Sequence, residues 1–162
     1  DAQESRGLGD VYKRQGYSVP EWPVHITMAA YENMDEKLLC DWTEEFCKSH
    51  NNVNVNLCSL GTFLPNKNSN VLYLAPAYSK TFVDFYYEFH YEYEKYCTGI
   101  GRYNSITDDS PSIHCTIAEI KTDDLQNAMK LVFDSNCFGE AKITALEVYT
   151  YPMRLIKRFE LK

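Results

Sequence analysis

Two short segments of this chain combine a histidine and a threonine at the same spacing, and these residue types can do acid–base chemistry. The pairs are His25 with Thr27 and His114 with Thr116, each separated by one apolar residue. Both pairs lie where apolar and polar residues alternate, which predicts a β-strand. Residues i and i+2 of a strand point to the same face, so each strand is expected to present an imidazole and a hydroxyl together.

Two such strands in equivalent positions would direct two imidazoles and two hydroxyls at one cleft, a set that suits phosphodiester cleavage without a metal. One histidine can take a proton from an attacking hydroxyl or water while the other protonates the leaving oxygen. The threonine hydroxyls can donate hydrogen bonds to non-bridging phosphoryl oxygens. We therefore predict His25, Thr27, His114 and Thr116 as catalytic residues. One His-x-Thr alone is common by chance, so the prediction depends on the repetition.

The other two histidines are expected to be structural. His50 ends a predicted helix, where a cation suits the helix dipole, and His90 lies in a helix with many aromatic residues. The histidines lack carboxylates or cysteines at ligand spacing, so no metal site and no cofactor are expected. The six cysteines form no CxxC pair and are expected to be reduced, buried thiols of a cytoplasmic protein.

The secondary structure around these residues repeats along the chain. Alternation predicts strands over 24–29, 53–64, 71–78, 113–118, 140–151 and 153–161, and helices with caps at Asn33, Ser79 and Thr122 lie between them. Glu36 completes a capping box with Asn33, and the second helix is expected to carry Phe82, Phe85, Phe89, Tyr93 and Tyr96 on one side. The predicted fold class is α+β: a bilobal, duplicated β-α-β-β module with two antiparallel sheets facing each other across a central cleft and helices outside.

The domain organisation follows from this repeat. Residues 16–162 are predicted to form a single two-lobed domain with halves of about 16–97 and 112–162, between which sheet strands can be exchanged. Residues 1–15 contain no apolar periodicity, and the string GLGDVYKRQ resembles a translated sequencing adapter. We expect a non-native or disordered leader there and exclude it from the fold.

The doubled motif resembles the 2H phosphoesterase superfamily, in the branch of the LigT-like 2′-5′ RNA ligases and cyclic phosphodiesterases. Residues 60–63 (LGTF) and 71–74 (VLYL) are similar to the family's glycine-bearing strand and the apolar strand after it. Phe89-His90 stands where many members carry a Leu-His pair, and residues 111–116 (PSIHCT) resemble the proline-led second motif. The resemblance covers about residues 20–161 and implies phosphodiester chemistry on nucleotides.

The net charge and the length of the apolar runs limit the classes of partner that the chain is expected to bind. The net charge of −7, from 23 acidic and 16 basic residues, disfavours binding to long double-stranded nucleic acid, whose affinity comes mainly from phosphate neutralisation. The apolar runs are too short to cross a ~30 Å hydrocarbon core, so no membrane partner is expected. We predict a cytoplasmic monomer that acts on a small nucleotide or oligonucleotide.

Substrate contacts are sought in the loops beside the motif strands. Trp22 and Tyr31 near the first motif and Tyr103 near the second can stack a base, and Arg102 can pair with a phosphate. The leading function is a metal-independent phosphodiesterase for 2′,3′-cyclic phosphates, 2′-5′ linked oligonucleotides or cyclic nucleotide signals, including those of antiviral immunity. The alternatives are an RNA 2′-5′ ligase running the reverse reaction, and a module that binds a nucleotide or RNA end without turnover.

Overall fold

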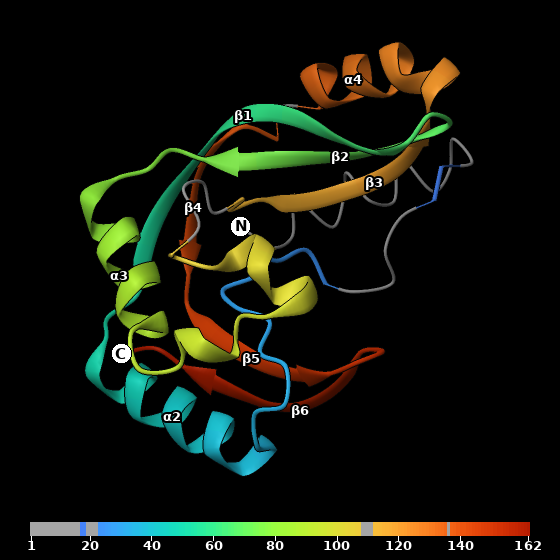
Figure 1. The fold of residues 1–162 in the computed structure, drawn as a ribbon. Coiled ribbons are helices and arrows are strands. Elements are labelled where there is room, and N and C mark those ends of the chain that lie inside the picture. The colour runs from blue at the N-terminus through green and yellow to red at the C-terminus, as the bar shows by residue number, and fades with distance from the viewer. Residues whose placement is uncertain (1–16, 19–22, 108–111, 136) are drawn as a thin grey trace. The chain divides into compact units, whose positions relative to one another are not determined.

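The chain is described by a computed structural model that covers residues 17–18, 23–107, 112–135 and 137–162 (Figure 1). The predicted leader and Trp22 lie outside the described residues. The chain divides into two compact units. The first combines Asp1–Ile26, Asn56–Ala77 and Ile113–Ala141, and the second combines Thr27–Val55, Tyr78–Ser112 and Lys142–Lys162. Each unit therefore contains segments from both predicted halves, 16–97 and 112–162.

The first unit is built on a four-stranded sheet with the order β3-β2-β1-β4. Its strands are β1 (Val53–Asn66), β2 (Ser69–Pro76), β3 (Cys115–Lys121) and β4 (Gly139–Ile143). The central strand β2 pairs antiparallel with both β1 and β3. Strand β2 alternates between buried and half-buried residues along its length, as a strand with one covered face must.

Helix α4 (Leu125–Asp134) covers one face of this sheet, as Figure 1 shows. The buried core between helix and sheet is aliphatic and consists of Leu72, Leu74, Ile117, Ala118, Ile120, Ala128 and Val132. Burying such side chains stabilises the fold by about 1.5–3 kcal/mol for each large one. Because strand residues alternate, the opposite face of the sheet presents the other set of side chains, which includes His114.

The second unit packs helix α2 (Glu36–Ser49) against a two-stranded antiparallel sheet of β5 (Ala145–Thr150) and β6 (Arg154–Glu160). Helix α3 (Lys80–His90) adds aromatic rings: Phe46 of α2 meets Phe85 and Phe89 edge-on, with both centroid distances 5.1 Å. The described residues also form three short 3-10 helices, η1 (Glu94–Tyr96), η2 (Gly99–Asn104) and η3 (Thr122–Asp124).

The α+β class with two antiparallel sheets is confirmed, but the strand predicted over residues 24–29 is wrong. Those residues are described and do not form a strand. Their carbonyls bond to side chains instead of to a neighbouring strand: the Thr27 carbonyl accepts from Asn104 Nδ2 at 3.4 Å, and the Met28 carbonyl faces His90 Nε2 at 2.7 Å. Side-chain hydrogen bonds from distant residues replace the ladder that the alternation predicts.

Two of the predicted helix caps are also wrong. Helix α2 begins at Glu36 with Asp35 as its cap, whose carboxylate accepts from the backbone N–H of Leu38, while Asn33 has a left-handed φ of 60°. Thr122 lies in η3, and its hydroxyl donates to the Lys67 carbonyl at 3.0 Å. Ser79 does cap α3, as predicted, by accepting from Phe82 N.

The remaining boundaries differ by local breaks. The strand predicted over 140–151 is two strands, β4 and β5, which separate at Thr144. Helix α3 ends at His90, so Tyr93 and Tyr96 do not continue its aromatic stripe. Within the described residues, no helix is long and apolar enough to cross a membrane.

Candidate active site

In the second His-x-Thr motif, His114 immediately precedes β3 and Thr116 lies within it, and the burial follows the alternation of the sequence. Cys115 between the two polar residues is buried at 3% exposure, while His114 and Thr116 are half-buried. Thr116 lies opposite Tyr73 of β2 in the strand register. The histidine and threonine therefore belong to the sheet face that α4 does not cover.

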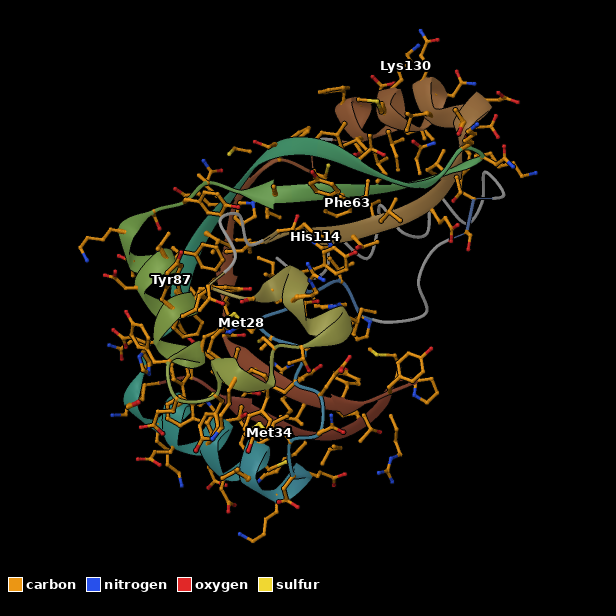
Figure 2. The ribbon with its side chains drawn as sticks, viewed as in Figure 1. Met28, Met34, Phe63, Tyr87, His114 and Lys130 are labelled. Atoms are coloured by element: carbon orange, nitrogen blue, oxygen red, sulfur yellow. The ribbon has the colours of Figure 1, made fainter. Side chains whose placement is uncertain are left out.

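Two aromatic rings surround the His114 imidazole on this face. Phe63 of β1 and Tyr73 of β2 stack with ring centroids 4.3 Å apart. The His114 ring meets Phe63 edge-on at 4.8 Å and lies 5.3 Å from the Tyr73 ring (Figure 2). Such a ring cluster restricts the orientation of the imidazole and offers apolar surface beside it.

Gly61 provides the space for this cluster. It pairs with Tyr73 across the strands, and a Cβ atom at position 61 would lie 2.3 Å from Tyr73 Cζ. The Tyr73 ring therefore lies directly over the Gly61 backbone. A larger residue at 61 would displace the ring that contacts His114.

His25 is brought to the same strand by its backbone. A hydrogen bond from the His25 backbone reaches the Cys115 sulfur, although burial dominates and raises the pKa of that thiol to about 11. The His25 ring is half-buried, and its Nδ1 lies 2.7 Å from the Pro23 carbonyl. A carbonyl only accepts, so a neutral His25 carries its proton on Nδ1 and presents Nε2 as the basic nitrogen.

His25, His114 and Thr116 belong to one unit, and the His25 backbone contacts Cys115 between the other two. Thr27 belongs to the second unit, where its carbonyl accepts from Asn104. The Thr27 hydroxyl stays a predicted participant.

The predicted substrate contacts have different surroundings. Arg102 and Tyr103 are exposed on η2 in the second unit, and stay predictions. Tyr31 is half-buried there; its hydroxyl donates to the Phe89 carbonyl at 3.3 Å, and its ring stacks on Phe89. Burial raises the pKa of Tyr31 well above its ordinary value. These contacts give Tyr31 a packing position.

The two remaining histidines have structural contacts. His50 is the C-terminal cap of α2, and its Nε2 lies 2.8 Å from the Glu88 carboxylate. His90 is fully buried. Contrary to the expectation from the sequence, His90 has both a carboxylate and a thiol within ligand distance, from Glu94 and Cys97.

Sequence reasoning therefore missed two groups. Gly61, Phe63 and Tyr73 were noted only as parts of apolar strands, and their approach to His114 depends on strand pairing. The His90-x₃-Glu94-x₂-Cys97 spacing was visible in the sequence and could have been recognised as a ligand pattern.

Comparison with known proteins agrees with this fold. Residues 2–152 match the model of the 2′-5′ RNA ligase superfamily, a match that includes most of the predicted leader. The chain is a member of the 2′-5′ RNA ligase superfamily. That membership supports an enzyme of phosphodiester chemistry.

Solved structures share the fold at low sequence identity. TT0787 of Thermus thermophilus is 14% identical with a TM-score of 0.55, and the alignment covers 99% of this chain and 90% of that one. Usb1 of Kluyveromyces marxianus is 10% identical with a TM-score of 0.51, covering 96% of this chain and 87% of that one. Among curated proteins, no significant match was found.

Proposed function

We propose that this protein is a phosphodiesterase that hydrolyses small nucleotides by acid–base catalysis with His25 and His114. The observation that carries the proposal is the convergence of His25 on the strand that presents His114 and Thr116. Superfamily membership supports the same class of reaction.

The reaction needs two proton transfers. One imidazole removes a proton from the attacking water or hydroxyl as its oxygen bonds to phosphorus. The other imidazole donates a proton to the leaving oxygen as the second P–O bond breaks. Nδ1 of His25 faces the Pro23 carbonyl, so Nε2 is the atom that would exchange protons. The Thr116 hydroxyl, and Thr27 through the repeat, would donate to the non-bridging oxygens.

The surroundings of His114 favour a nucleotide as the substrate. The stacked Phe63 and Tyr73 rings offer an apolar surface beside the imidazole, which suits a base or ribose. The net charge of −7 favours small substrates over long nucleic acid. Within this class we propose 2′,3′-cyclic phosphates, 2′-5′ linked oligonucleotides and cyclic nucleotide signals.

The reverse reaction, 2′-5′ ligation, is the second candidate because the same two proton transfers run in both directions and the family model is named for it. An assay that supplies either the linked substrate or the two RNA ends distinguishes the directions. Accumulation of joined product from ends alone would replace hydrolysis as the function.

The test is turnover of a panel of 2′-5′, 3′-5′ and 2′,3′-cyclic nucleotides in EDTA, with products separated by chromatography. Circular dichroism in the same buffer checks that the chain stays folded. Turnover by the wild type, and its loss in His25→Ala and His114→Ala, supports the proposal. Turnover that appears only when Mg²⁺ or Ca²⁺, which prefer oxygen ligands, is added to the folded protein would overturn it, and binding without turnover would indicate a binding module.

A further inference from the structure

Three buried side chains with metal-ligating atoms converge at the end of α3, in the second unit. His90 Nδ1 lies 2.8 Å from Glu94 Oε2 and 3.5 Å from Cys97 Sγ, and the three ligand atoms all lie within 4.8 Å of one another. His90 is completely buried, Cys97 is 8% exposed, and the Glu94 side chain is 13% exposed. These groups take no part in the proposed chemistry.

Each of the three groups is oriented by a further hydrogen bond. His90 Nε2 lies 2.7 Å from the Met28 carbonyl, which fixes Nδ1 as the nitrogen that faces the cluster. The other oxygen of Glu94, Oε1, accepts from the Ser105 hydroxyl and from Thr107. The Cys97 sulfur accepts a backbone hydrogen bond from Ala30. Metal-binding histidines and carboxylates have this kind of support around them.

We propose that His90, Glu94 and Cys97 bind a zinc ion. Imidazole, thiolate and carboxylate are the ligand types that zinc prefers, and the three leave one position for water. A neutral imidazole, a thiolate and a carboxylate balance the two positive charges of zinc, so the buried site would carry no net charge.

Two of the three separations between ligand atoms can be compared with those of tetrahedral zinc. From the usual Zn–N and Zn–S bond lengths, a nitrogen and a sulfur on one zinc lie about 3.5 Å apart, and a nitrogen and a carboxylate oxygen about 3.3 Å apart. The His90–Cys97 separation of 3.5 Å already matches. The His90–Glu94 separation of 2.8 Å must open by about 0.5 Å to reach the zinc value.

Without a metal, hydrogen bonds would hold the cluster around a neutral thiol. Burial raises the pKa of Cys97 to about 12, which keeps its sulfur a neutral thiol. Burial also raises the pKa of Glu94, but hydrogen bonds from Ser105 and His90 outweigh it and the net shift is downward. A neutral thiol is a poor zinc ligand, so experiment can separate the metal-free state from the zinc-bound state.

The zinc site would also position the segment that follows the first motif, within the second unit. Met28 and Ala30, which support the ligands, follow Thr27 directly in the chain. The close approach of Gly101 to the Ala30 carbonyl, where a Cβ would lie 1.9 Å from the oxygen, holds the same segment from the η2 side. Zinc would therefore hold residues 28–30 against the end of α3 and have no contact with the phosphate.

The experiment measures metal in the full-length protein, purified without chelators or metal resins. After equilibration with Zn²⁺ and removal of free metal, we expect one zinc per chain. Cys97→Ser and Glu94→Gln should lose it, whereas Cys58→Ser, which changes an exposed cysteine of β1, should retain it. Ser105→Ala should weaken zinc binding by about 10–100-fold, because it removes a hydrogen bond to the ligand carboxylate.

Cobalt keeps the test decisive if a variant fails to fold. Co²⁺ bound to the wild type should give a thiolate-to-cobalt charge-transfer absorption, which Cys58→Ser retains. The absence of stoichiometric zinc, zinc retained in a folded Cys97→Ser, or bound cobalt without the thiolate band would each overturn the proposal. These readouts do not involve turnover, so the zinc site and the proposed phosphodiesterase activity can fail separately.

Discussion

The two His-x-Thr motifs are alike in sequence and differ in how the fold holds them. Thr116 lies in β3 and His114 immediately precedes it, so the pairing of Cys115 and Thr116 with β2 sets their direction. His25 and Thr27 lie in a described segment that forms no strand, and backbone and side-chain bonds to Cys115 and Asn104 fix its path. The same two side chains can thus be presented with or without a strand ladder.

This contrast indicates that a His-x-Thr motif needs its side chains to be held in a fixed direction. A β-strand is only one way to hold them. In β3, the direction follows from local register, so it withstands single changes. In the first segment, partners of the backbone come from far along the chain, such as Asn104 for the Thr27 carbonyl and His90 for the Met28 carbonyl. The first motif should therefore be the more easily disturbed of the two, although both are expected to be equally necessary.

The largest effect is expected from removing either imidazole. His25→Ala and His114→Ala should each lower kcat about 10²–10⁴-fold, the usual contribution of a general acid or base. The double variant should be little worse than either, because groups acting as a unit are not additive. Single-turnover rates measure this, with His50→Gln as a control that affects a helix end and leaves turnover intact. Substantial turnover in His114→Ala would contradict the assignment of equally necessary roles to His25 and His114.

The second-largest effect is expected from removing the threonine hydroxyls. Thr116→Val and Thr27→Val keep the side-chain shape and delete one donor each, which typically costs about 3 kcal/mol of transition-state stabilisation, or roughly a hundredfold in kcat. Thr98→Val, at the exposed start of η2, is the matched control. A loss for Thr116→Val with a wild-type rate for Thr27→Val would show that the difference between the motifs extends to their chemistry.

The pH dependence of kcat/KM should be bell-shaped. One imidazole must start neutral to accept a proton and the other must start charged to donate one, so activity falls on both sides, by about tenfold per pH unit far from the optimum. Removing one histidine should abolish one limb in the residual activity. A rate that rises steadily to high pH would contradict the two-histidine mechanism.

Gly61→Ala is expected to act through Tyr73. The new methyl would lie 2.3 Å from Tyr73 Cζ, so the ring must move away from Phe63 and His114. Overpacking of this kind typically costs about 1–3 kcal/mol of unfolding free energy, which urea denaturation can measure. Adding Tyr73→Ala should remove the clash, so the double variant should lose less stability than the sum of the two single ones.

The smallest effect is expected for Cys115, whose sulfur accepts a hydrogen bond from the His25 backbone. Burial raises the pKa of Cys115 to about 11, so at pH 8 only about one thiol in a thousand is the reactive thiolate. Cys58 is exposed and should be alkylated by iodoacetamide first, as peptide mass spectrometry can show. Rapid modification of Cys115 in the folded protein would mean that the His25 segment leaves β3 readily.

Features that depend on neighbouring residues could be predicted from the amino-acid sequence alone. The alternation around Cys115 predicted a buried thiol between a half-buried histidine and threonine, because a strand turns successive side chains to opposite faces. Ser79 predicted the start of α3, because a capping side chain bonds to a backbone N–H only three residues ahead. The His-x-Thr motif also predicted the superfamily, because the motif occurs twice in the chain.

Features that depend on residues far apart became visible only in the folded chain. The carbonyls of Thr27 and Met28 bond to Asn104 and His90, 77 and 62 residues away, so alternation alone wrongly predicted a strand there. The Phe63–Tyr73 stack on His114 depends on the pairing of three strands. The His90–Glu94–Cys97 cluster exists because α3 stops at His90 and the chain turns back through η1. Neither local propensity nor periodicity contains these distances, since they arise when separate segments bury their surfaces together.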